Sequence, residues 1–95
     1  MAAYVPDLMD RSKLARADVR FARSPADLVD MEADVFVVDL SRPGVLEVLP
    51  ALEGRRVVGF GSHVDVELLE AARVAGCAEV LPRSKFFARA AELLS

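Results

Sequence analysis

Hydrophobic residues along the chain follow two alternating periodicities, which predict strands and helices in turn. Short runs that are continuously apolar or alternate in polarity predict five strands, at residues 2–6, 19–22, 34–40, 56–61 and 78–82. Between them, apolar residues recur at three- and four-residue spacing, which predicts helices at 8–17, 25–31, 45–52, 66–75 and after Ser84. The chain is therefore predicted to contain five successive strand–helix units.

Polar residues and a glycine support the predicted helix boundaries. Ser24 followed by Pro25 is a typical N-cap with proline in the first turn. Asp65 and Ser84 are further candidates for N-caps, because their side chains can accept hydrogen bonds from the first backbone N–H groups of a helix. Gly76 is suited to close the helix before it in the left-handed conformation.

The same periodicity predicts which residues face the core. The Val-Phe-Val-Val run at 35–38 is continuously apolar, as expected for a strand that is buried on both faces. In the helix at 66–75, the inward residues are predicted to be Val66, Leu69, Ala72 and Val74. In the last helix, the predicted inward stripe consists of Phe87, Ala90, Ala91 and Leu94.

Strand–helix alternation of this kind predicts an α/β fold. Parallel strands need long crossover connections, which the intervening helices supply, and such crossovers are right-handed. The helices are then expected on both faces of one parallel sheet, in a three-layer, doubly wound architecture. No internal repeat or linker interrupts the pattern, so residues 1–95 are predicted to form a single domain.

Composition narrows the class of protein. The 95 residues carry a formal net charge of −3, and 54% are hydrophobic against 28% charged. This balance is too apolar for a disordered chain, and every apolar run is far shorter than the roughly 20 residues of a membrane-spanning helix. The acidic balance disfavours nucleic-acid partners. The lone Cys77 excludes an internal disulfide and a cysteine zinc site, and with no basic N-terminal stretch we expect a cytoplasmic protein.

In doubly wound sheets, ligands bind just beyond the C-terminal ends of the strands. The residues that follow the predicted strands are therefore the candidate site residues: Asp7, Asp39, Ser41, Gly61, Ser62, His63 and Arg83. His63 is the only histidine and has no nucleophile at a recognisable spacing, which favours an ordinary loop position over catalysis or metal binding. Gly59 and Gly61 do not complete a dinucleotide-binding pattern, so close packing is the favoured explanation for both.

Two segments resemble the receiver domain of bacterial response regulators. In Val37-Val-Asp-Leu-Ser-Arg-Pro-Gly44, Asp39 matches the phosphoacceptor that ends the family's third strand, and Pro43 matches the proline four residues later. In Ala75-Gly-Cys-Ala-Glu-Val-Leu-Pro-Arg83, Arg83 stands seven residues after Gly76, at the position of the family's lysine. The resemblance covers nearly the whole chain. It implies a flavodoxin-like sheet with strand order 2-1-3-4-5, here with shortened helices.

The acidic cluster departs from the receiver pattern. Receivers hold Mg²⁺ with two acids after the first strand together with the phosphoacceptor. Here Pro6 and Asp7 leave one acid at that place, and Asp10 is a distant substitute. Because Mg²⁺ needs several oxygen ligands, the resemblance implies no cofactor beyond a weak Mg²⁺ site at Asp7 and Asp39.

The residues that correspond to the basic part of the receiver site also depart from the family pattern. Arg83 replaces the family's lysine, and a guanidinium is bulkier than an ammonium and planar. Ser84 replaces the proline that normally follows, and the family's switch serine or threonine falls on Gly61 or Ser62. Asp39 has two interpretations. It is either a phosphoacceptor or metal ligand, or it is a structural acid that caps the turn after its strand or pairs with Arg83. The structural interpretation is favoured.

The resemblance therefore implies an atypical receiver, or pseudo-receiver, in signal transduction that binds a protein partner independently of phosphorylation. In receivers, the fourth helix, last strand and last helix commonly form the contact face. Here that face carries Glu67, Glu70, Arg73, Ala88, Arg89 and Glu92, a mixed-charge set suited to a homodimer with two-fold symmetry. Its partner is not expected to be a nucleic acid or a membrane.

Two other functions stay open. The first is a small enzyme that acts on a phosphorylated small molecule at the switch point of the sheet. The second is a regulator similar to the STAS antagonists of anti-sigma factors, in which Val-Val-Asp-Leu-Ser also occurs. A STAS domain requires a phosphorylatable serine that caps a helix, whereas Ser41 is followed by the turn Arg-Pro-Gly.

Overall fold

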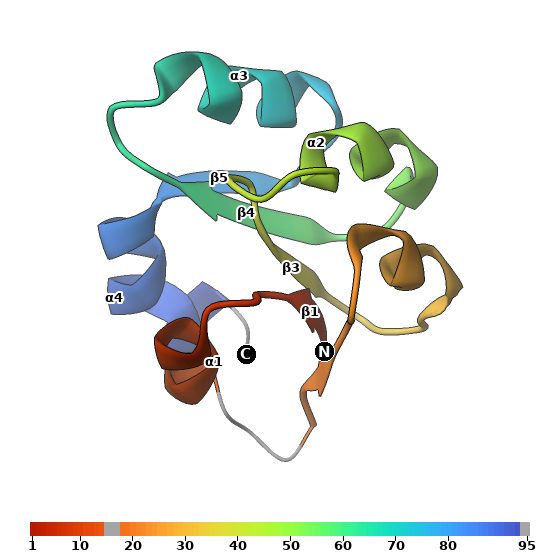
Figure 1. The fold of residues 1–95 in the computed structure, drawn as a ribbon. Coiled ribbons are helices and arrows are strands. Elements are labelled where there is room, and N and C mark those ends of the chain that lie inside the picture. Colours follow the sequence, from red (N-terminus) through yellow and green to blue (C-terminus); the bar gives the residue numbers. More distant parts are fainter. Residues whose placement is uncertain (15–17, 94–95) are drawn as a thin grey trace.

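The computed structural model describes residues 1–14 and 18–93, which form one parallel sheet with helices on both faces (Figure 1). The strands are β1 (Ala2–Tyr4), β2 (Arg20–Phe21), β3 (Phe36–Asp39), β4 (Val57–Gly61) and β5 (Glu79–Pro82). All pairs are parallel, and the spatial order is β2-β1-β3-β4-β5. The predicted flavodoxin-like α/β fold and its strand order are therefore confirmed.

The helices are short, as predicted. They are α1 (Leu8–Leu14), the 3₁₀ helix η1 (Pro25–Asp30), α2 (Val45–Val48), the 3₁₀ helix η2 (Leu49–Leu52), α3 (Val66–Val74) and α4 (Arg83–Leu93). Ser24 caps η1 by accepting a hydrogen bond from the backbone N–H of Asp27, as expected. Pro50 lacks an N–H donor, and the chain changes from α to 3₁₀ geometry at this point. The predicted extension of the first helix over residues 15–17 lies outside the described residues.

Figure 1 shows α2 and α3 above the sheet and α1 and α4 below it. Side chains of β3 alternate between the two layers: Phe36 and Val38 join the core that includes η1, α2 and α3, and Val37 joins the core that includes α1 and α4. All four residues of β3 are buried, which confirms the strand that the apolar run predicts. Asp39 is the C-terminal residue of β3, so its position is fixed by a strand that is packed on both faces.

Three phenylalanines attach α4 to the sheet. Phe60 of β4 stacks on Phe86 with 4.8 Å between ring centroids, and Phe87 meets both rings edge-on at 5.2 and 4.9 Å. The helix begins at Arg83, so Ser84 lies inside its first turn and the predicted N-cap at Ser84 is wrong. Phe86 and Leu93 are its buried residues. Of the predicted stripe, Phe87 and Ala90 pack partly buried against the same core, Ala91 is exposed, and Leu94 lies outside the described residues.

The ends of α3 follow the prediction, and its inward face follows it in part, because Leu69 and Ala72 pack against the core. Asp65 accepts a hydrogen bond from the backbone N–H of Leu68 and caps the helix, and Gly76 has a φ of 112°. Ala72 is buried, whereas Val66 and Val74 are 68% and 80% exposed. The helix packs on the sheet through a stripe centred on Ala72, so the inward placement predicted for these two valines is wrong.

A helix that crosses a membrane must be both long and apolar. Within residues 1–14 and 18–93, no helix combines the length and the apolar character needed to cross a bilayer.

Candidate functional site

A pocket of about 270 Å³ opens at the C-terminal ends of β3, β4 and β5, where the fold predicts a site. It is lined by Asp39, Ser41, Gly61, Ser62, His63, Arg83 and Ser84. All the candidate residues except Asp7 therefore come together in one place. Asp7 stands after β1 and does not line this pocket, although its charge acts on Arg83.

Asp39 is buried, and the turn that follows it occupies both of its carboxylate oxygens. Oδ1 accepts hydrogen bonds from the backbone N–H of Ser41 at 3.1 Å and from its hydroxyl at 2.6 Å. Oδ2 accepts one from Nε of Arg42 at 3.4 Å. A buried carboxylate requires such donors, and here Ser41 and Arg42 of its own turn supply them. Asp39 therefore caps the strand-to-loop turn, as one of the two interpretations proposed.

Arg83 bonds Asp10 and not Asp39. Its Nη2 donates to Oδ1 of Asp10, a residue of α1 that is only 1% exposed. The predicted ion pair between Arg83 and Asp39 is absent from the described structure. The reason is geometric: α1 and α4 lie below the sheet together, so the first residue of α4 meets the first turn of α1, while Asp39 is already satisfied by its own turn.

The sequence signal for Asp10 is weak but present. Leu14 stands four residues after Asp10 on the same face of α1, and both are buried. An acid that shares a helix face with a core leucine must find a partner, and the arginine after β5 supplies it. The second oxygen of Asp10, Oδ2, is buried and has no hydrogen-bond partner in the described part of the chain.

Aromatic rings support the guanidinium of Arg83. Its central carbon lies 5.6 Å from the ring centroid of Phe60 and 5.4 Å from that of Phe87. Such cation–π contacts favour the charged form and restrict the side chain. The hydrogen bond to Asp10 raises the pKa of Arg83, and the negative charges of Asp10, Asp39 and Asp7 add to the effect, which outweighs its partial burial. Arg83 is thus a fixed cation that faces three carboxylates.

Asp7 is the N-cap of α1. Its Oδ1 accepts hydrogen bonds from the backbone N–H groups of Met9 at 2.9 Å and Asp10 at 3.1 Å. The bond from Asp10 is the main cause that lowers the pKa of Asp7, and the bond from Met9 and the charge of Arg83 act in the same direction. No three His, Cys, Asp or Glu side chains gather as a metal site among residues 1–14 and 18–93. The weak Mg²⁺ site at Asp7 and Asp39 stays a prediction.

The opposite wall of the pocket belongs to the loop between β4 and α3. Ser62 and His63 are exposed there, and the hydroxyl of Ser62 accepts a 3.4 Å hydrogen bond from the backbone N–H of Val64. Gly61 permits the close approach of α3, because a Cβ at this position would lie 3.3 Å from Cδ2 of Leu69. These residues supply an imidazole and two hydroxyl groups, counting Ser84, around the charged centre.

Comparison of the chain with protein-family models, with curated proteins and with solved structures finds no match. The function of the cleft must therefore be inferred from its own chemistry. For the STAS alternative, the relevant geometry is that Gly44 and not Ser41 stands at the N-cap of α2. The Ser41 hydroxyl donates to Asp39 instead.

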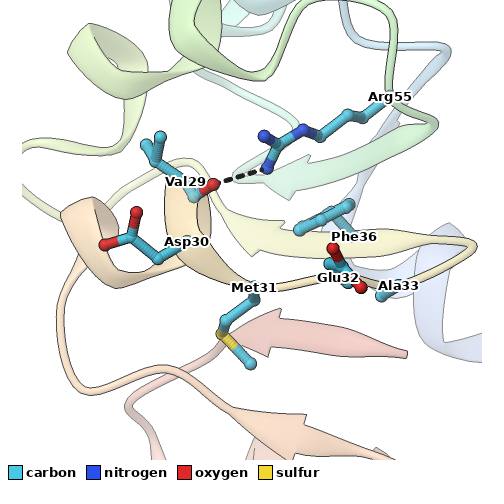
Figure 2. Close-up of a pocket in the computed structure, with 7 residues that line it drawn as sticks. All are labelled: Val29, Asp30, Met31, Glu32, Ala33, Phe36 and Arg55. Carbon is cyan, nitrogen blue, oxygen red and sulfur yellow. Dashed lines mark hydrogen bonds between the residues drawn. The ribbon is translucent and has the colours of Figure 1, made fainter.

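A second pocket, of about 310 Å³, lies at the other end of the strands, beside the N-terminal residue of β3 (Figure 2). Its basic residue is Arg55, which extends across the ring of Phe36 with 5.4 Å from its central carbon to the ring centroid. Nη1 of Arg55 donates to the backbone carbonyls of Leu28 at 3.2 Å and Val29 at 3.0 Å. Through these hydrogen bonds, Arg55 connects η1 to the segment that precedes β4. We therefore interpret these contacts of Arg55 as structural.

Proposed function

We propose that this chain is a receiver-like signalling module, of the pseudo-receiver type, that binds a protein partner without being phosphorylated. The fold and the placement of Asp39 and Arg83 at the ends of β3 and β5 support the comparison with receivers. The observation that carries the proposal is the pair between Arg83 and the buried Asp10. It places a cation of the chain itself among the acids of the cleft.

Phosphoryl transfer to Asp39 would need two things that the cleft does not offer freely. A carboxylate oxygen must attack phosphorus, and both oxygens of Asp39 already accept hydrogen bonds from Ser41 and Arg42. A cation must also neutralise the incoming phosphoryl oxygens. Arg83 would have to leave Asp10 to do so, and the buried carboxylate would lose its only partner among the described residues.

The same arrangement explains how the module would work without a switch. Two arginines, Arg42 and Arg83, face the three acids Asp7, Asp10 and Asp39, so most of the negative charge of the cleft is compensated within the chain. In this proposal the partner recognises one permanent conformation. Phosphate and Mg²⁺ have no part in controlling that recognition.

A titration followed by two-dimensional amide NMR tests the proposal. Mg²⁺ is added first and then beryllofluoride, which imitates an aspartyl phosphate. We expect a dispersed spectrum with no saturable shifts. Saturable shifts centred on Asp7, Asp39, Ser62 and Arg83 that spread into α3 would contradict the proposal and indicate a working phospho-switch.

Two variants serve as controls for that titration. The R83K/P6D double variant restores an acid after β1 and a lysine after β5, so it is expected to bind Mg²⁺ more tightly than the wild type. Failure of this variant to improve binding would show that the alignment with receivers is wrong. The D39N variant is expected to lose modest stability and to keep partner binding, because Asp39 acts through its turn.

A second candidate function is a small enzyme that acts on a phosphorylated small molecule. The lining of the pocket favours it: the guanidinium of Arg83, the imidazole of His63 and the hydroxyls of Ser62 and Ser84 converge on about 270 Å³. Inorganic phosphate is the simplest probe. Saturable amide shifts at Ser62, His63 and Ser84 that disappear in the H63A variant would support this candidate over the signalling module.

A further inference from the structure

The pocket beside the N-terminal residue of β3 is lined by a base and two acids that do not pair with one another. Arg55 contributes a guanidinium, and Asp30 and Glu32 contribute carboxylates (Figure 2). Within residues 1–14 and 18–93, none of these three charges takes part in an ion pair. Opposite charges therefore line one volume of about 310 Å³ without contacting each other.

Arg55 is held in place and keeps unused hydrogen-bond donors. Its Nη1 donates to the backbone carbonyls of Leu28 and Val29, and its central carbon lies 5.4 Å from the ring centroid of Phe36. Its Nε and Nη2 have no hydrogen-bond partner among the described residues. Because the side chain is already ordered, it loses little freedom when it binds a carboxylate, and two nitrogens of a guanidinium can bind both carboxylate oxygens.

The two acids determine which carboxylate ligand suits the pocket. Asp30 and Glu32 give the lining one more negative charge than Arg55 can balance. They would repel a phosphate, a dicarboxylate or a simple carboxylate, because each of these carries only negative charge. A ligand with one ammonium group and one carboxylate matches both signs of charge in the lining.

The other side chains of the lining are apolar. Val29, Met31 and Ala33 are half-buried, and Phe36 is buried. An aliphatic group of a ligand would remove part of this apolar surface from water, which favours binding. The volume of about 310 Å³ is at the lower end of the range for ligand pockets, so it suits a molecule of about the size of an amino acid.

We propose that this pocket binds a free α-amino acid with an aliphatic side chain. The carboxylate of the ligand binds the guanidinium of Arg55, and its ammonium group is attracted by Asp30 and Glu32. Its side chain lies against the apolar part of the lining. The pocket lies at the other end of the strands from the cleft and shares no residue with it, so this proposal stands independently of the proposed function.

A titration with L-leucine, followed by two-dimensional amide NMR, tests the proposal. We expect saturable shifts over residues 29–33 and at Arg55, with a Kd of about 1 mM. An absence of saturable shifts would overturn the proposal. Saturable shifts centred on Ser62 and Arg83 would also overturn it, because they would place the ligand in the cleft.

Two analogues of leucine test whether both charges of the ligand are used. Isocaproate is leucine without the ammonium group, and isoamylamine is leucine without the carboxylate. Each is expected to bind at least about tenfold more weakly than leucine. If either analogue binds as tightly as leucine, the pocket does not recognise an amino acid and the proposal is wrong.

The exposed acids allow a test that leaves the core of the protein untouched. The D30N/E32Q variant is expected to bind leucine about fivefold or more weakly, because the attraction for the ammonium group is lost. The same variant is expected to bind isocaproate as well as the wild type or better, because the repulsion of its carboxylate is relieved. Asp30 and Glu32 are both exposed, so we expect the variant to fold.

The E53Q/E79Q variant is the matched control for this charge change. Glu53 and Glu79 are exposed and do not line the pocket, so leucine binding is expected to stay unchanged. If the control weakens leucine binding as much as D30N/E32Q does, the effect comes from net charge alone. That result, or an equal loss of leucine and isocaproate binding in D30N/E32Q, would refute recognition of the ammonium group by the two acids.

Discussion

Replacing Arg83 by methionine is the most direct test of the charge arrangement in the cleft. Methionine keeps much of the aliphatic packing and removes the guanidinium. Asp10 then remains 1% exposed with both oxygens lacking a donor among the described residues. The carboxylate must stay charged in an apolar site, take up a proton or draw the helix open to water, and each of these destabilises the fold.

The expected loss of stability depends on how exposed the side chains of Asp10 and Arg83 are. Removal of one partner from a fully buried ion pair costs about 3–5 kcal/mol. The side chain of Arg83 is 45% exposed, so solvent already weakens the pair and about 2 kcal/mol is the better expectation. Loss of the cation–π contacts to Phe60 and Phe87 adds about 0.5–1 kcal/mol. The total of about 2–3 kcal/mol corresponds to a Tm lowered by about 10 °C or more.

The opposite truncation is expected to cost less. In the D10N variant the remaining partner is Arg83, which can turn to water, so we expect a loss of about 1 kcal/mol. In the D10N/R83M variant no unpaired charge is buried, and a loss of about 1–2 kcal/mol is expected, less than for R83M alone. The coupling energy between the two positions is then about 2 kcal/mol.

Urea unfolding of the wild type and the three variants provides the measurement. Equal m-values would establish that the four proteins expose similar surface on unfolding. The decisive comparison is the order of stabilities, with R83M the least stable of the four. If D10N costs as much as R83M, or if the two losses simply add, the buried carboxylate does not depend on Arg83 and the charge arrangement inferred for the cleft is wrong.

Three further outcomes are expected. G59A should destabilise the fold by about 1–3 kcal/mol in urea unfolding, because its Cβ would lie 3.0 Å from side-chain atoms of the buried Leu40. R55M should cost about 1–2 kcal/mol by losing the two hydrogen bonds to the end of η1, with faster amide exchange there as the local readout. The folded-state pKa of Asp7 is lowered, so its stabilising effect is present above the unfolded value of about 4 and is lost as pH falls. The stability difference between wild type and D7N should therefore be present at pH 7 and shrink on acidification below about pH 4.

The fold could be predicted because its signals are local and repeated. The apolar run of β3, the Ser24 and Asp65 caps and Gly76 each fix one boundary from neighbouring residues alone. The strand order confirmed here came from the resemblance to receivers. The residues after β3, β4 and β5 gather at one edge because parallel strands all end there.

The partners within the site could not be predicted, because they depend on how distant elements pack. Asp39 lies in a predicted strand and Asp10 lies in a predicted helix, and either acid could lie near Arg83. The sequence does not show which of the two side chains points toward the guanidinium. The turn after β3 decides this by binding Asp39 through Ser41 and Arg42. The inward placement predicted for Val66 and Val74 of α3 is wrong for a related reason. A helix with apolar residues on two sides does not reveal from its sequence which side packs on the sheet.

The pair between Asp10 and Arg83 also has a consequence for the order in which the chain folds. The two residues are 73 positions apart, so their contact closes a long loop and forms only after α4 has packed. Because closing so long a loop costs entropy, we expect this contact to form late in folding, after the transition state. Weakening the pair should then leave the folding rate nearly unchanged and speed unfolding. Arg83 would thus set how long the native molecule lasts once it has formed.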